Sequence, residues 1–91
     1  MSGFEVDDFA RLERHDGHQI LCRIEAEEDS EGSYGPRVIT RCDYGVTIET
    51  RGAVFPDTEE GYAAAARVMA ELDLAAWFEQ AKMSVLQLVG D

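Results

Sequence analysis

Positively charged residues are scarce in this chain, and acidic residues far outnumber them. The 91 residues include 8 Lys and Arg against 19 Asp and Glu, which gives a formal net charge of −11 at pH 7. A surface with this balance repels phosphate backbones and anionic lipid headgroups on average. The composition therefore argues against direct binding to nucleic acid or to a membrane, and it favours a basic protein as the partner.

Long apolar runs are absent as well. No segment approaches the ~18 to 20 uninterrupted apolar residues that a membrane-spanning helix requires. The N-terminal residues 1–8, MSGFEVDD, have neither the basic nor the apolar region of a signal peptide. We therefore expect a cytoplasmic protein.

Cysteine is sparse, and two residues, Cys22 and Cys42, do not make a disulfide framework. Both occupy positions expected to face the interior of a sheet, where Cys behaves as a small apolar residue. Neither has the cationic or helix N-terminal setting that activates a catalytic thiol. Motifs for binding phosphate or dinucleotides, and those of hydrolases, are also missing. We expect no enzymatic activity and no cofactor.

The chain does contain enough apolar sequence for one folded core. Hydrophobic residues make up 45% of it, and a chain of this size buries somewhat over ~60% of its unfolded surface on folding. This amount supports a single domain over residues 1–91, and a second core would not fit.

The first half of the chain predicts an antiparallel sheet. Apolar residues alternate with polar ones over residues 18–28, and the same period returns in residues 37–42 and 46–51. The side chains expected to face inward are Ile20, Cys22, Ile24, Ala26, Val38, Thr40, Cys42, Val46, Ile48 and Thr50. Outward arginines of the second strand are expected to lie across from Glu25 and Glu27.

Residues 7–14 are open to two interpretations. Good helix formers behind an acidic start favour a helix, whereas the Asp16-Gly17 pair is a strong hairpin signal. We favour the hairpin, with a three-residue loop of residues 15–17. The pairs expected across it are Arg14 with His18, Leu12 with Ile20, and Ala10 with Cys22. That register points the apolar side chains of the first strand inward.

The period becomes helical after Pro56. Asp57 followed by Glu60 resembles a capping box, and apolar residues then recur at helical spacing. Asp73 is expected to cap a second helix, and residues 84–89 fit either a helix or a short strand. The predicted fold is α+β: a three- or four-stranded antiparallel meander, with β-hairpins in residues 9–51, packed on one face by two C-terminal helices at about 58–72 and 74–83.

The segment His15-Asp16-Gly17-His18 has the residue types of a metal or proton-transfer site. Hairpin geometry explains its Asp-Gly pair, and no CxxC or HxxxH spacing accompanies the two histidines. We therefore predict no metal site. A small metal-dependent regulator that uses His15, His18 and the cysteines is the weaker alternative.

The acidic run of residues 25–31 is the candidate interaction site. In extended chain, alternate carboxylates repeat about every 6.6 Å, a regular anionic array that a phosphate-binding groove could accept. A solubilising turn is the simpler interpretation of any single acidic run. The candidate partner-binding residues of the run are Glu25, Glu27, Glu28, Asp29 and Glu31.

These observations favour a small acidic, non-enzymatic interaction protein that binds and blocks a basic, nucleic-acid-handling surface of a larger protein. Phage-encoded inhibitors of host defence that mimic nucleic acid are one class with this charge and size. The alternative is a structural or assembly subunit that forms a homodimer or larger homo-oligomer. Its contact would be made by Trp77 and Phe78 on the second helix, because large aromatic residues are enriched in interfaces.

Overall fold

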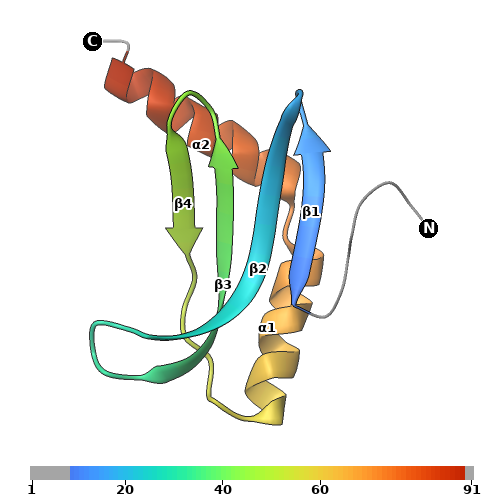
Figure 1. Cartoon of the computed structure of the whole chain (residues 1–91), viewed down its shortest axis with the longest axis vertical. Helices are drawn as coiled ribbons and strands as arrows, with labels where there is room; N and C mark the ends of the chain where they lie inside the picture. Colours follow the sequence, from blue (N-terminus) through green and yellow to red (C-terminus); the bar gives the residue numbers. More distant parts are fainter. Residues whose placement is uncertain (1–8, 90–91) are drawn as a thin grey trace, which may run out of the picture.

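The computed structural model describes the backbone of residues 9–89 and the side chains of residues 9–87. The elements in chain order are β1 (Ala10–His15), β2 (His18–Glu28), β3 (Tyr34–Asp43), β4 (Thr47–Arg51), α1 (Glu59–Glu71) and α2 (Leu74–Val89). The strands form one antiparallel sheet in the order β1-β2-β3-β4, and the two helices follow it in the chain (Figure 1). The predicted α+β fold is confirmed.

The core lies between the helices and one face of the central strands. The inward positions read from β2 and β3 are largely correct, because Ile20, Cys22, Ile24, Val38, Thr40 and Cys42 are buried there. The buried cluster consists of Ile20, Cys22, Ile24, Val38 and Cys42 from the sheet and Ala65, Met69, Leu74 and Phe78 from the helices. Both helices therefore cover the same face of the sheet.

The register of β1 differs from the prediction. His15 pairs with His18, so the loop between the strands contains the two residues Asp16 and Gly17. Their φ angles are 54° and 80°, and two positive φ angles in succession are the mark of the tight turn whose twist fits a hairpin. The three-residue loop was wrong because Asp16, as well as Gly17, adopts the left-handed conformation.

This one-residue shift turns every side chain of β1 to the opposite face. Arg11 and Glu13 face the helices, whereas Ala10 and Leu12 face outward. Residues 1–8 lie outside the described residues. The expected absence of a signal peptide concerns these residues, and so do the first two positions of the ambiguous segment 7–14. The described part of that segment, from Ala10, is strand.

Arg11 makes use of its inward position by capping the end of α1. Its Nη1 donates to the carbonyl oxygens of Met69 and Leu72 at 2.6 and 2.9 Å, and its Nε donates to Glu13 Oε2 at 2.8 Å. The last turn of α1 contains no basic residue of its own. The guanidinium of β1 therefore supplies the positive charge that the carbonyl end of a helix favours.

The helix starts agree only partly with the prediction. Thr58, and not Asp57, is the N-cap of α1: its Oγ1 accepts from the Gly61 N–H at 3.0 Å. The cap moves by one residue because the Thr58 carbonyl already accepts the first helical bond, from the Tyr62 N–H at 2.9 Å. Asp73 caps α2 as predicted, since its Oδ1 accepts from the N–H of Ala76 at 3.1 Å.

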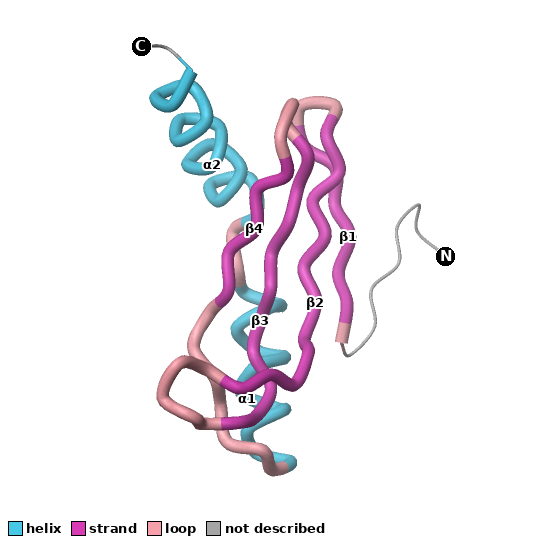
Figure 2. The backbone as a smooth tube through the Cα atoms, turned by 60° about the vertical axis from the view of Figure 1, so that its left-hand side comes forward, coloured by secondary structure: helices cyan, strands magenta, loops and turns pink. Residues whose placement is uncertain are grey.

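The second helix is longer than the sequence predicted. It continues to Val89, so residues 84–89 are helical. In Figures 1 and 2, α2 runs obliquely over one end of the sheet and its C-terminal part extends past β4. Neither α1 nor α2, the helices of the described residues, is long and apolar enough to cross a bilayer.

Candidate interaction site

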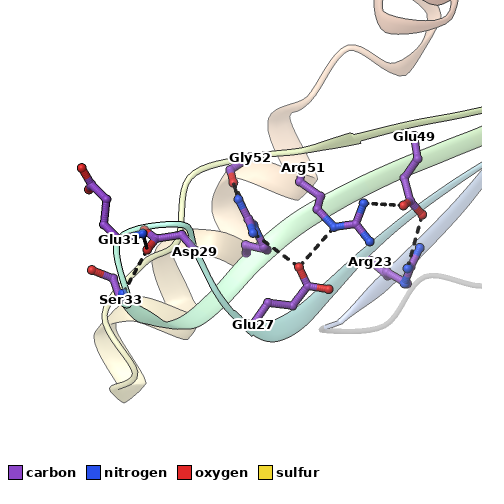
Figure 3. Close-up of polar contacts among 9 residues, drawn as sticks. Arg23, Glu27, Asp29, Glu31, Ser33, Glu49, Arg51 and Gly52 are labelled. Carbon is purple, nitrogen blue, oxygen red and sulfur yellow. Dashed lines mark hydrogen bonds and ion pairs between the residues drawn. The ribbon is translucent and has the colours of Figure 1, made fainter.

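The outward face of the sheet carries a network of arginine and glutamate side chains from three strands (Figure 3). Glu27 of β2 accepts from Arg37 Nη1 at 3.4 Å and from Arg51 Nε at 3.2 Å. Arg51 also donates to Glu49 Oε1 at 2.5 Å, and Glu49 Oε2 lies 3.6 Å from Arg23 Nη2. The hydrogen bond that Arg51 donates to Glu49 raises the pKa of the guanidinium, so Arg51 stays charged.

Two of the predicted site residues, Glu25 and Glu27, belong to this network. Glu25 forms an ion pair with Arg23, and Arg37 is its register partner on β3, as the sequence predicted. Glu27 is paired with two arginines. Because their charge is balanced within the sheet, these two glutamates add little to an open anionic surface.

The arginines also cover an apolar side chain. Ile39 lies on the outward face, yet its exposed fraction is 0%. Arg23 and Arg51 are its register partners on the neighbouring strands. Since the hydrocarbon part of an arginine packs on apolar surface while its head stays in water, the network shields Ile39 as well as balancing charge.

Of the other three predicted carboxylates, Glu28 is the last residue of β2, and Asp29 and Glu31 lie in the loop between β2 and β3. This part of the chain is at the same end of the molecule as the start of α1 (Figures 1 and 2). Gly35, near the start of β3, contacts the segment that leads into α1. A Cβ there would lie 1.9 Å from the Phe55 carbonyl oxygen and 3.1 Å from the Asp57 nitrogen, so only glycine fits. We define the acidic end as the six residues Glu28, Asp29, Glu31, Asp57, Glu59 and Glu60.

The charge of the acidic end is unbalanced. Within residues 9–87, none of its six carboxylates forms an ion pair with an Arg or Lys. All are exposed except Asp29, whose Oδ1 accepts from the N–H groups of Glu31 and Ser33 at 2.9 Å each (Figure 3). The amino end of α1 offsets roughly half an elementary charge. A strong negative field therefore remains at this end.

A groove of about 540 Å³ opens beside the start of α1. Its walls are formed by Phe9, Asp57, Thr58, Glu59 and Tyr62. The rings of Phe9 and Tyr62 meet edge to face with their centroids 6.0 Å apart. The groove thus places aromatic surface beside two carboxylates of the acidic end. The sequence analysis missed it, because no local pattern brings the residue before β1 next to α1.

The two aromatic candidates on α2 have different environments. Phe78 is fully buried, with the rings of His15, His18 and Tyr44 packed around it. Trp77 is half-buried, and its Nε1 donates to Thr50 Oγ1 of β4 at 2.9 Å. Phe78 thus belongs to the core and presents no contact surface, while Trp77 is tied to the sheet.

The histidines and cysteines do not come together. His15 Nε2 lies 3.2 Å from a carboxylate oxygen of Glu79, whereas the thiols of Cys22 and Cys42 are buried between sheet and helices. Burial raises the pKa of both thiols. In the part of the chain that the structure describes, no group of three or more His, Cys, Asp or Glu side chains is placed to hold a metal ion.

The acidic end and its groove together form the candidate interaction site. Their carboxylates come from two segments far apart in the sequence, and the fold brings them to one end of the molecule. The chain matches no protein-family model, no curated protein and no solved structure.

Proposed function

We propose that this protein is a small, acidic, non-enzymatic interaction protein whose acidic end binds a basic surface of a larger protein. The observation that carries this proposal is the segregation of charge: arginines balance Glu25 and Glu27, while the six carboxylates of the acidic end have no cationic partner within residues 9–87. Asp43, Glu71, Asp73 and Glu79 also lack an Arg or Lys partner within residues 9–87, so the acidic end holds six of the ten carboxylates that lack one.

The partner surface is of the kind that handles nucleic acid, because Arg and Lys clusters that bind phosphates also bind carboxylates. When the acidic end binds such a surface, it blocks the access of nucleic acid. The protein would then act as an inhibitor, and phage-encoded inhibitors of host defence are one class that acts in this way. The proposal takes the cytoplasm as the place of binding.

The groove adds specificity to this attraction. An arginine or lysine side chain that enters it meets the rings of Phe9 and Tyr62 and the carboxylates of Asp57 and Glu59. A cation over an aromatic face gains about 0.5 to 2 kcal/mol, in addition to the charge pairing. Association is therefore expected to be steered by charge, with a rate that falls as ionic strength rises.

The test compares two variants with the same change in net charge. The first, Glu28→Gln/Glu31→Gln/Glu59→Gln, removes three charges from the acidic end. The matched control, Glu25→Gln/Glu71→Gln/Glu79→Gln, removes three elsewhere. Binding to an immobilised arginine-rich peptide is measured by surface plasmon resonance at about 50 mM and about 300 mM salt.

We expect the wild-type protein and the control to bind with similar affinity at low salt, and the acidic-end variant to bind about tenfold more weakly. Affinity of the wild-type protein should fall with salt. An equal loss in both variants, or wild-type binding that does not change with salt, would overturn the proposal.

A further inference from the structure

The C-terminal part of α2 lies outside the packed domain. Leu74, Phe78 and Ala81 in the first half of the helix are buried against the sheet. From residue 82 to residue 87 no side chain is buried. Figures 1 and 2 agree that this part of the helix continues past β4. About two turns of helix therefore have little of the sheet to pack on.

This projecting part is apolar on its solvent side. Met83 and Leu86 are 56% and 52% exposed, and residues three apart in a helix lie on the same side. Short helices have little stability in water without packing against other elements. The exposed pair therefore has the properties of a helix surface that another protein covers.

The distribution of charge favours a second copy of this chain as that protein. Residues 80–90 contain no Asp or Glu, and their one charged residue, Lys82, lies 3.8 Å from Asp16. In a chain of net charge −11, two copies approach each other at the least cost where acidic residues are missing. A surface that pairs with itself around a twofold axis needs no complementary partner.

The position of α2 supports the same conclusion. Its C-terminal part and the acidic end lie at opposite ends of the molecule (Figure 1). Contact through α2 therefore keeps the two acidic ends apart, and repulsion between exposed charges is largely screened beyond about 8 Å at physiological ionic strength. It also leaves both acidic ends open.

We propose that α2 forms a symmetric homodimer in which Met83 and Leu86 pack on the same residues of a second copy. The proposal does not depend on the function of the acidic end. It assigns the contact to the solvent side of the helix and gives neither Trp77 nor Phe78 a part in it.

Sedimentation velocity over a range of protein concentrations tests the dimer. The wild-type protein should approach twice the monomer mass of 10.1 kDa as concentration rises. The variant Met83→Glu/Leu86→Glu should remain monomeric with unchanged helix content by circular dichroism. Ser84→Glu, a charge at an exposed position on another side of the helix, should still dimerise.

Two results would overturn the dimer: a wild-type protein that stays monomeric at every concentration, as expected if a different protein covers the helix, or equal dissociation by Ser84→Glu. The acidic-end variant Glu28→Gln/Glu31→Gln/Glu59→Gln should dimerise normally. The Met83→Glu/Leu86→Glu variant should in turn keep its affinity for the arginine-rich peptide. The failure of one proposal is thus distinct from the failure of the other.

Discussion

Arg11 donates a hydrogen bond to the carbonyl oxygen of Met69 at 2.6 Å, although 58 residues separate the two in the sequence. The same guanidinium bonds the Leu72 carbonyl and the Glu13 carboxylate. Its side chain is 16% exposed, so water replaces these bonds poorly. One side chain thus ties the first strand to the end of α1.

Arg11→Ala should lower the free energy of unfolding by roughly 2 to 3 kcal/mol, because hydrogen bonds to charged groups are among the stronger ones. Arg11→Lys should be intermediate, since an ammonium lacks the planar fork of the guanidinium. Urea denaturation measures both. The control is Arg14→Ala, an exposed arginine of the same strand, with an expected change within about 0.5 kcal/mol. Similar losses for Arg11→Ala and Arg14→Ala would refute the capping role.

Gly61→Ala should destabilise the protein although alanine is the better helix former. A Cβ at this position would lie 1.7 Å from the Pro56 carbonyl oxygen. An unhindered change from Gly to Ala in a helix gains roughly 0.5 to 1 kcal/mol, but here the backbone at Pro56 must move, with an expected net loss of about 1 to 3 kcal/mol.

Chemical denaturation decides the sign of this change. Ala63→Gly, at an exposed position in the same helix, measures the propensity difference alone and should cost about 1 kcal/mol. A gain in stability for Gly61→Ala would contradict this expectation, because it would show that the backbone at Pro56 moves at little cost.

Gly17→Ala should cost about 1 to 2 kcal/mol, because Gly17 has φ of 80° and the left-handed conformation is unfavourable for residues with a Cβ. No atom lies within 4 Å of the Cβ position, so the loss reports backbone conformation and not crowding. Gly17→Asn should lose clearly less, since Asn tolerates this conformation better. Thermal unfolding of the two variants side by side provides the measurement, and an equal loss would argue against the turn described above.

The buried thiols should make stability fall at alkaline pH. Burial raises the pKa of Cys22 and of Cys42, so the folded protein keeps thiol protons that the unfolded chain loses above about pH 8.5. The contribution of the two thiols to the free energy of unfolding is therefore complete below about pH 8.5 and decreases as the pH rises. Between about pH 8 and pH 10, urea denaturation should show a steeper loss for the wild-type protein than for Cys22→Ala/Cys42→Ala. Parallel curves for the two proteins would contradict this expectation.

The sequence predicted the sheet well where side chains alternate and poorly where one residue decides the register. In β2 and β3 the period of two identifies the face that packs on the helices, although Ile39 on the opposite face is also buried. In β1 the same reasoning failed, because it placed the apolar Ala10 and Leu12 inward. The inward residues are Arg11 and Glu13. Arg11 donates to carbonyl oxygens at the end of α1, and Glu13 accepts from Arg11. No local pattern connects α1 to this strand. Tertiary contacts, and not alternation, fix the register there.

The candidate site was predicted only in part for a similar reason. The acidic run is visible in the sequence, but the pairing of Glu25 and Glu27 with arginines depends on strand register across three strands. Asp57, Glu59 and Glu60 join the candidate site because the chain returns to this end of the molecule beside Gly35. The number of charged residues can be counted from a sequence, but which of them form ion pairs depends on the fold.

The inward charges of β1 matter during synthesis on the ribosome. Because β1 and β2 precede α1 in the chain, they leave the ribosome first, so Arg11 and Glu13 at first have no folded helix beside them. Until α1 has emerged, we expect their hydrated charges to discourage the edge strand from joining the apolar faces of neighbouring nascent chains. Once α1 has folded, Arg11 binds the carbonyl oxygens of Met69 and Leu72. The same side chain that opposes association of the incomplete hairpin therefore stabilises the complete domain.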